Sequence, residues 1–337
     1  MNHKIITCTG FGGTGSSVIS DLMAEFKSVK GCGDFEWTMS SDIDGVSDLQ
    51  HYIVDDFNAI KVTEGIYRFK RYTGIITRGY KRILGIDIQS VFDEYVNELV
   101  DFRWMGSNNM QVWRYGWVKR KWYGLVCKTK MLLSRILSSN DGYERGYQKP
   151  KMLLELSQGD SKFFDATKRM YGRLLDSLDE ANQYNYLCFD RLVPPYTFKR
   201  YSKYFQNIKI VCVDRDPRDL FLLNALYWHE GWIPSDNIDT YIQWFRTIRN
   251  NFKRDLAEAD PGTVMSIQFE DAIYHYNETI KKVIDFIGLD PADHVFKKKH
   301  FNPDYSIRNT KLWEKTDQYK EEIIKIETEL QDYCYKY

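Results

Sequence analysis

The chain has 337 residues, of which 43% are hydrophobic, and equal numbers of Lys+Arg and Asp+Glu, 47 each. A chain of this size can bury a large core, and it fits one elaborated α/β domain better than a row of small modules. A net charge of zero provides no overall field that would draw the protein to nucleic acid or to a membrane. No apolar run reaches the roughly 18 residues of a membrane span.

The neutral total hides an uneven distribution of charge. Residues 1–60 contain three Lys/Arg and nine Asp/Glu, whereas residues 61–150 contain seventeen Lys/Arg and eight Asp/Glu, a net of +9. The basic segment either attracts an anionic ligand or is an ordinary basic helical surface, and the sequence leaves both readings open.

The six cysteines are scattered and form no C-x-x-C pair. Cys8, Cys188 and Cys212 each lie inside a short apolar run that is typical of a buried strand. Such thiols behave as small hydrophobes in a reducing compartment, and their spacing does not match a disulfide framework or a zinc site. Together with a start that shows no signal peptide, this predicts a soluble, cytoplasmic protein without a bound metal.

The first elements have the order strand, glycine loop, helix. Lys4–Thr9 is a β-type run, residues 10–15 are rich in glycine, and Ser16–Phe26 has apolar residues at helical spacing. This order is the outline of a phosphate-binding unit. Residues 32–60 look irregular, and we expect a strand near Phe35–Met39.

Residues from about 61 to 180 show mostly helical periodicity, and we interpret them as an insertion that covers the substrate side. Strand-like runs then return at Asn185–Phe189, Lys209–Val213 and Val264–Phe269. Buried apolar runs that alternate with amphipathic helices predict a parallel sheet covered on both faces. The fold class is therefore α/β, a P-loop-type parallel sheet flanked by helices in one domain, 1–337, with a mostly helical insertion.

Two helices are predicted near the C-terminus. The pattern over His275–Ile287 ends at Gly288, a favourable residue just after a helix. A charged amphipathic helix is expected over Glu314–Tyr333.

The glycine loop has two readings. The spacing Gly10-x-Gly12-x-x-Gly15 matches a dinucleotide fingerprint, which is weak evidence by itself. The same loop suits a phosphate cradle, in which glycines let backbone N–H groups surround an anion and hydroxyls add donors. An ATPase loop would have Lys after the last glycine, and its absence argues against Mg-ATP chemistry. The candidate anion-binding residues of the loop are Gly12, Gly13, Thr14, Gly15, Ser16 and Ser17.

A second motif follows the strand that ends at Val213. It reads Asp-Arg-Asp-Pro-Arg-Asp over residues 214–219 and leads into a helix, with Pro217 in the first turn where a helix tolerates it. Arg215 stands at the carboxyl end of the strand, where α/β sheets bind ligands, and its planar guanidinium suits a phosphate. A salt-bridged turn is the alternative reading.

In this arrangement the chain resembles the sulfotransferase family that uses 3′-phosphoadenosine 5′-phosphosulfate (PAPS). The resemblance implies that the glycine loop binds the 5′-phosphosulfate and that Arg215 binds the 3′-phosphate. A third family motif is echoed by Phe269-Glu270-Asp271-Ala272 and by Phe286-Ile287-Gly288-Leu289. The family's basic loop with a Trp resembles residues 306–313, where Arg308 and Lys311 would also contact the 3′-phosphate. The likeness covers about 1–30 and 185–315, and not the middle segment.

The chain departs from the family pattern at three positions. Many relatives have Lys or Arg in the first loop where this chain has Gly13, and Arg191 is the candidate replacement cation. The family's 3′-phosphate serine corresponds to Leu223, and the neighbouring Asn224 is the candidate amide donor.

At the third position, cytosolic relatives have a histidine base, but this chain has Leu192. No catalytic histidine can be carried over. Asp190 and Glu36 are therefore the candidate bases, since a buried carboxylate can take the proton of an acceptor hydroxyl.

The leading hypothesis is transfer of a sulfuryl group from PAPS to a hydroxyl of a glycan or related acceptor, which the basic segment 61–150 would favour if the acceptor is anionic. One alternative is an NAD(P)-dependent oxidoreductase, in which Asp34 or Glu36 would hold the ribose. Another is a family member that binds nucleotide or glycan without turnover. A homodimer through the aromatic surface of the insertion stays open.

Overall fold

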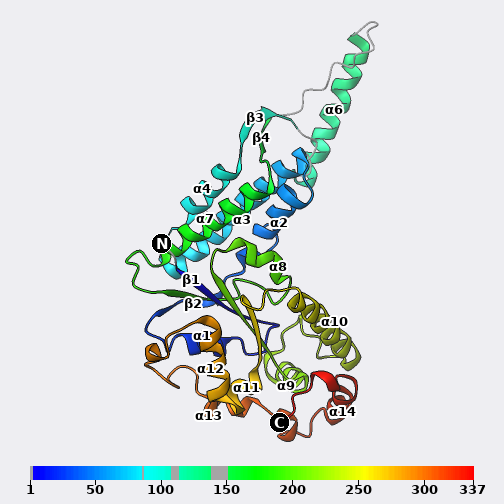
Figure 1. Ribbon diagram of the computed structural model, residues 1–337. Coiled ribbons are helices and arrows are strands. Elements are labelled where there is room, and N and C mark those ends of the chain that lie inside the picture. Colours follow the sequence, from blue (N-terminus) through cyan, green and yellow to red (C-terminus); the bar gives the residue numbers. More distant parts are fainter. Residues whose placement is uncertain (1–2, 86, 108–113, 138–150) are drawn as a thin grey trace.

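A five-stranded sheet forms the centre of the computed structural model, which describes residues 3–85, 87–107, 114–137 and 151–337 (Figure 1). The strand order is β2-β5-β1-β6-β7, and every neighbouring pair is parallel. The strands are β1 (Lys4–Gly10), β2 (Val29–Glu36), β5 (Tyr186–Asp190), β6 (Ile208–Asp214) and β7 (Val264–Gln268). Helices flank this sheet, which confirms the predicted α/β class.

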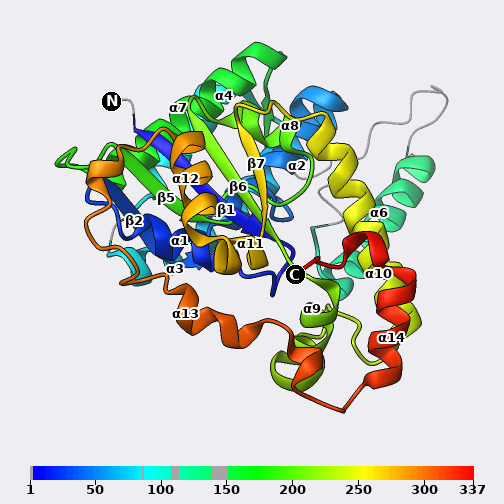
Figure 2. The same ribbon diagram turned by 60° about the horizontal axis from the view of Figure 1, so that its bottom comes forward.

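Side chains of the central strands alternate between two hydrophobic cores, as the period of two in a strand requires. On β1, Ile6 and Cys8 contribute to one core and Ile5 to the other. The first core is closed by α1 (Ser17–Met23), α11 (Phe269–Tyr274) and α12 (Tyr276–Ile287), which lie over one face of the sheet in Figure 2.

The opposite face is covered by a helical layer, most of which comes from the chain between β2 and β5. Its helices are α2 (Val46–Gln50), α3 (Ala59–Leu84), α4 (Gln89–Leu99), α7 (Asp160–Leu178), α8 (Phe198–Tyr201) and α10 (Ile238–Ala257). Within it the rings of Phe69 and Tyr95 meet edge to face at 5.6 Å, and the Tyr95 hydroxyl bonds to that of Thr167 at 2.8 Å. These contacts join α3, α4 and α7 into one packed unit.

Two further elements come from the middle of the chain, and the first of them is joined to α3 by a hydrogen bond of 2.8 Å from the Thr63 hydroxyl to the Glu155 carbonyl. An antiparallel hairpin of β3 (Phe102–Gly106) and β4 (Met152–Leu156) interrupts the segment that we expected to be mostly helical. Because four of the five β3 residues are exposed, this strand lacks the alternation that identifies a half-buried strand in a sequence. Helix α6 (Trp117–Leu137) projects away from the body (Figure 1).

The C-terminal helices form a third cluster beside the sheet. In this cluster, α9 (Pro217–Leu223) and α14 (Lys320–Glu329) pack with α10 around buried apolar residues, whereas α13 (Pro303–Ser306) contacts α11. The final helix, α14, is shorter than the predicted Glu314–Tyr333. Residues 315–319 form turns and bends, and Leu312–Glu314 before them is a single 3-10 turn.

Two other boundaries differ from expectation. Strand β2 occupies Val29–Glu36 and not residues 35–39, and its register shifts between Gly31 and Glu36. Helix α1 ends at Met23, three residues early, and Phe26 then forms a bridge to His294. In the described part of the chain, no helix is both long enough and apolar enough to cross a bilayer.

Candidate functional site

The predicted site residues gather at the carboxyl edge of the sheet. Because the strands are parallel, β1, β5, β6 and β7 all end there, at Gly10, Asp190, Asp214 and Gln268. This edge is where open α/β sheets bind ligands.

The strand order does not match a dinucleotide fold. In that fold the strand after the first helix pairs directly with the first strand, whereas here β5 lies between β1 and β2. Glu36, at the end of β2, accepts a hydrogen bond from Arg191 at 2.8 Å and so has a partner within the protein. The topology therefore weakens the oxidoreductase reading of the glycine spacing.

Three glycines of the loop adopt left-handed backbone conformations. Their φ angles are +71° at Gly12, +68° at Gly13 and +85° at Gly15, which disfavour residues with a Cβ. Thr14 is buried, and its hydroxyl accepts a hydrogen bond from the Phe11 N–H at 3.2 Å. This hydrogen bond stabilises the conformation of the loop.

The start of α1 is open. The N-cap, Ser16, makes no side-chain cap hydrogen bond, and Ser17 is exposed. Since α1 has only seven residues, the anion-binding capacity of this region rests on the loop amides and the serine hydroxyls more than on a helix dipole.

Aromatic rings lie directly against the loop. A Cβ added at Gly12 would come within 2.0 Å of the Trp232 ring, and one at Gly13 within 2.3 Å of the Trp228 ring. Both tryptophans come from the segment after α9, and sequence reasoning missed them. A π-type turn at Asn224–Trp228 turns this segment back toward the loop, and no local pattern signals that turn.

Arg215 joins three of the sequence motifs. Its Nη1 donates to the Gly13 carbonyl at 3.2 Å, and its Nη2 donates to the carbonyl of Asn309. Its guanidinium lies 4.3 Å from the centre of the Phe269 ring, which also packs against Gly15. The Arg215 side chain therefore joins the glycine loop, 202 residues earlier in the chain, to the loop at Asn309, 94 residues later.

The guanidinium of Arg215 is buried but incompletely paired. The residue is 3% exposed, and its Nε has no hydrogen-bond partner. In the described ranges, no carboxylate oxygen lies within 4.0 Å of its guanidinium nitrogens. A buried cation in this state is a suitable partner for an anionic ligand.

The neighbouring acids of the motif are occupied elsewhere. Asp214 bonds to Arg249 at 2.7 Å, and Asp216 caps α9 and binds Arg218 at 2.6 Å. Asp219 accepts from the backbone N–H groups of Lys311 and Leu312. Asp219 therefore attaches the loop at residues 306–313 to the start of α9.

Burial raises the pKa of two carboxyl groups near Arg215. It raises the pKa of Asp219 to about 6 and that of Glu270 to about 8, although the positive charge of Arg215 acts in the opposite direction on both. One oxygen of Glu270 accepts from the Asp216 N–H at 3.1 Å, and the other has no partner. A protonated Glu270 leaves the region less negative, which favours an anion.

The two predicted cations of the 306–313 loop lie on its outer side. Arg308 is exposed and stacks on the Tyr305 ring at 3.5 Å. Lys311 has a φ of +51°, and its Nζ lies 4.4 Å from the centre of the Tyr337 ring. Both side chains contact aromatic rings beside the loop, and neither is buried.

Asn224 does not face the predicted anion site. Its amide donates to the Ile233 carbonyl at 3.1 Å and to the Ser235 hydroxyl at 2.7 Å, and its oxygen accepts from the Glu230 N–H at 2.8 Å. The amide is therefore committed to the segment that carries Trp228 and Trp232. The structure gives Asn224 the role of positioning this segment, in contrast to the expected contact with a phosphate.

The three candidate catalytic residues lie together where β5 and β2 end. Arg191 has a φ of +54°, and its guanidinium pairs with Glu36. Asp190 accepts a hydrogen bond from the Cys8 thiol at 3.3 Å. Burial raises the pKa of Asp190 and the charge of Glu36 adds to this, whereas the Cys8 bond and Arg191 lower it. Leu192 points into the core, so its position could not present a base to the site.

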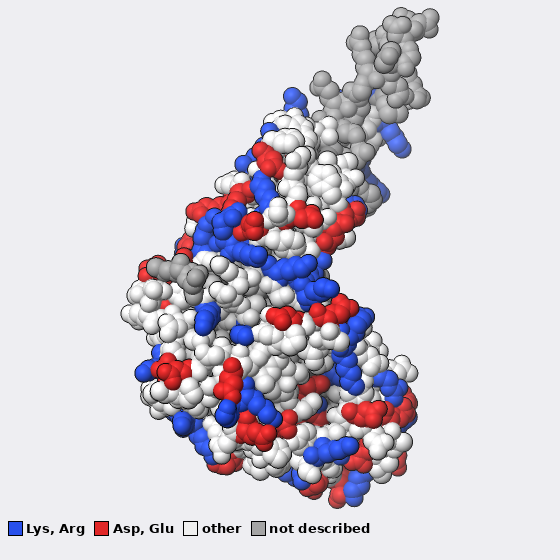
Figure 3. Space-filling view, viewed as in Figure 1, with Lys and Arg blue, Asp and Glu red and all other residues white. Residues whose placement is uncertain are grey.

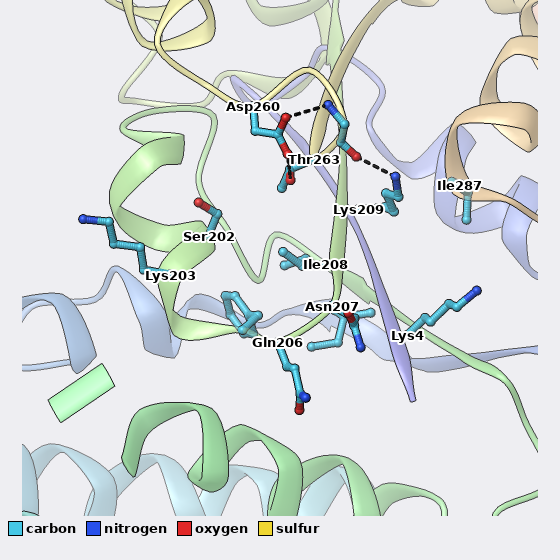
Figure 4. Close-up of a pocket in the computed structure, with 13 residues that line it drawn as sticks. Lys4, Ser202, Lys203, Gln206, Asn207, Ile208, Lys209, Asp260, Thr263 and Ile287 are labelled. Atoms are coloured by element: carbon cyan, nitrogen blue, oxygen red, sulfur yellow. Dashed lines mark hydrogen bonds between the residues drawn. The ribbon is translucent and has the colours of Figure 1, made fainter. Parts of the chain in front are cut away.

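A hollow of about 640 Å³ lies at the opposite, amino-terminal edge of the sheet, outside the candidate site (Figure 4). Lys4, Asn207 and Lys209 are among the residues that line it. The Asp260 carboxylate accepts from Gly262 and Thr263, and Lys209 donates to the Gly262 carbonyl at 2.5 Å. These polar groups satisfy one another.

Comparison with known proteins gives one family match. Residues 131–293 match the model of the sulfotransferase family; they include Asp190, Arg191, Arg215 and Glu270. No curated protein matches the chain. A solved structure, described as the sulfotransferase domain from the curacin biosynthetic pathway, is similar with a TM-score of 0.44 and 13% identity, covering 98% of each chain. The family match covers just under half of the chain, and over that segment the chain is similar to the sulfotransferase family.

Proposed function

We propose that this chain transfers a sulfuryl group from PAPS to a hydroxyl of a glycan or related acceptor. The observation that carries the proposal is the state of Arg215, a buried guanidinium without a carboxylate partner that bonds to both the glycine loop and the 306–313 loop. Buried polar atoms normally have partners. A phosphate at this point would supply the missing partner for Nε.

The residues present fit a nucleotide with a phosphate at each end. The N–H groups and hydroxyls of residues 12–17 suit the 5′-phosphosulfate, and Arg215 suits the 3′-phosphate, with Arg308 and Lys311 at its border. When bound, PAPS would supply the activated sulfuryl group. The chain's own tasks are to hold and orient both reactants and to accept the proton of the acceptor hydroxyl.

Asp190 is our choice for the group that accepts this proton. A raised pKa makes a carboxylate a better base near neutral pH. Arg191 is our choice for the cation near the transferred group. Its pair with Glu36 is partly exposed, and such pairs contribute only about 0–1 kcal/mol, so an anion can compete for the guanidinium.

The glycan acceptor rests on the resemblance, because carbohydrate-modifying sulfotransferases often use an acid as the base. A cytoplasmic location is supported by the six cysteines, all of which are free thiols, four of them buried. Each of the four buried thiols has a pKa raised by burial, which keeps it inert.

Calorimetric titration tests the nucleotide site. Adenosine 3′,5′-bisphosphate (PAP) should bind the wild-type chain, and NADH should not. Loss of a charge-assisted contact is worth about 1.5–3 kcal/mol, so Arg215→Ala should weaken PAP binding by roughly 10- to 150-fold. Arg254→Ala, an exposed arginine of α10, is the matched control and should leave affinity unchanged. Equal PAP affinity in wild type and Arg215→Ala would contradict the proposal.

A transfer assay tests the reaction. PAPS with labelled sulfur is incubated with neutral and acidic glycans, and transfer to at least one glycan is expected. PAP binding without transfer to any acceptor would identify the chain as a nucleotide-binding family member without turnover.

A further inference from the structure

Helix α6 carries large apolar side chains that are exposed to solvent in the described part of the chain. It projects from the helical layer (Figure 1), and Trp122 and Ile136 are 67% and 70% exposed. The apolar side chains of α6 that are more than half exposed are Trp117, Val118, Trp122, Leu125, Leu132, Leu133 and Ile136.

Most of these side chains share one face of the helix. Val118, Trp122, Leu125, Leu132, Leu133 and Ile136 follow the spacing i, i+4, i+7, i+14, i+15 and i+18. At 3.6 residues per turn, these positions fall within an arc of about 100°. The arc runs the length of the helix, about 30 Å at 1.5 Å per residue.

The rest of the helix surface is strongly basic. The 21 residues of α6 include six Lys/Arg and no Asp/Glu, so α6 alone carries most of the net charge of +9 in residues 61–150. By helical angle, Lys121 and Lys128 border the apolar arc on one side, and Lys119 and Lys130 border it on the other. In Figure 3, blue Lys and Arg side chains are also dense across the waist of the molecule below α6.

The base of α6 is held to the body. Arg114, just before the helix, pairs with Glu64 of α3 at 2.6 Å and stacks on the Tyr67 ring at 3.5 Å. The β3–β4 hairpin lies at the same end of the molecule (Figure 1) and adds exposed Phe102 and Met105. These Arg114 contacts therefore fix the N-terminal end of α6 to the helical layer.

We propose that α6 binds in the plane of a lipid surface that bears anionic headgroups. The apolar arc would enter the boundary between headgroups and acyl chains, and the bordering lysines would extend to the phosphates, as in interfacial helices. Each basic residue near such a surface adds to the attraction. A second copy of the chain fits less well, because two helices with six positive charges each would repel.

Vesicle co-sedimentation of the full chain tests this proposal independently of the sulfuryl-transfer reaction. The chain should bind vesicles of mixed phosphatidylcholine and phosphatidylserine about tenfold or more tightly than vesicles of phosphatidylcholine alone, and added salt should weaken binding. Trp122→Glu with Leu132→Glu, and separately Lys119→Glu with Lys121→Glu, should each reduce binding about tenfold or more.

Matched controls lie elsewhere on the surface. Ile43→Glu replaces an apolar residue that is 79% exposed, and Lys281→Glu with Lys282→Glu replaces two exposed lysines of α12. Both should bind vesicles as the wild type does. Equal thermal unfolding of all variants establishes that the fold is retained.

Three results would overturn the proposal. The first is that the wild type does not bind anionic vesicles, and the second is that the α6 variants bind them as tightly as the wild type does. The third is that the wild type does not bind vesicles but forms a dimer in sedimentation velocity, and that Trp122→Glu dissociates this dimer. The last result would assign the face to a second copy.

Discussion

Arg249 and Arg215 are both almost fully buried, but their surroundings differ. Arg249 is 1% exposed and donates from Nε and Nη2 to the Asp214 carboxylate. Its guanidinium lies between the rings of Phe11 and Phe245, at 3.7 and 4.2 Å from their centres. The guanidinium of Arg215 donates only to carbonyl oxygens among the described residues and stacks on Phe269. A paired buried arginine holds the fold together, whereas an arginine without a counter-ion is suited to bind one.

Removing Arg249 should therefore reduce stability. Arg249→Met would leave Asp214 buried without its cation, and breaking a buried pair costs about 3–5 kcal/mol. Urea unfolding measures the loss, and Arg249→Met with Asp214→Asn should recover part of it. A loss below about 1 kcal/mol would show that the pair is effectively solvated.

Glu270 should make stability depend on pH. In the folded protein its carboxyl keeps the proton up to about pH 8, whereas in the unfolded chain it loses the proton near its ordinary pKa of 4.5. Unfolding between these values releases a proton, so the free energy of unfolding should fall as pH rises from about 5 to about 8. Asp219 adds to the lower part of this range, up to about pH 6.

Urea unfolding of Glu270→Gln at several pH values checks this expectation. The variant should lose most of the decline above pH 6, because Gln does not titrate. An unchanged slope would mean that Glu270 is ionised in the folded protein.

Asp190→Asn should abolish transfer while leaving the nucleotide site intact. Loss of a general base lowers kcat about 10²- to 10⁴-fold, and PAP affinity should stay within about twofold because Asp190 lies outside the Arg215 contacts. Arg191→Ala should likewise lower kcat more than binding. Glu36→Gln serves as the comparison for the second candidate base. If Glu36→Gln reduces kcat and Asp190→Asn does not, the two carboxylates exchange roles.

At the scale of elements, the glycine loop excludes the cation that many relatives have. Gly13 has a φ of +68°, and its missing side chain leaves room for the Trp228 ring. Gly13→Lys should therefore not restore the family's lysine. We expect a stability loss of about 1–2 kcal/mol from the left-handed backbone alone, and weaker PAP binding.

Thermal unfolding and calorimetry check the Gly13→Lys prediction. Trp228→Ala in the same chain should recover part of the stability. Gly172→Lys, in open space on α7, is the control and should be nearly neutral. A more active and equally stable Gly13→Lys enzyme would show that the loop adopts the family geometry.

The elements that could be predicted from the sequence are those whose burial follows a simple period. The runs of β1, β5 and β6 are apolar because both faces of these strands are buried. The predicted bounds of these strands and of β7 lie within one residue of the structure. Strand β3 is exposed and lacks such a period, and its hairpin with β4 was missed for that reason. The hydrogen bond from the Asn224 amide to the Ile233 carbonyl forms because the chain turns back at Asn224–Trp228, and no local sequence pattern predicts that turn.

At the scale of the whole molecule, the parallel sheet explains why distant motifs meet. Ordering β5 and β6 on either side of β1 brings Asp190 and Arg215 to the two sides of the glycine loop. The resemblance predicted the motifs and their order along the chain. It could not predict that Trp228 and Trp232 would lie against the loop or that α6 would project, because both features lie outside the four motifs.

Hydrogen–deuterium exchange with saturating PAP tests most directly whether the glycine loop and the 306–313 loop hold one nucleotide through Arg215. PAP should slow exchange in peptides that cover residues 10–17 and in those that cover 306–313, at the same nucleotide concentration, and NADH should change neither. Slower exchange in one of these segments alone, or in neither, would contradict a shared site.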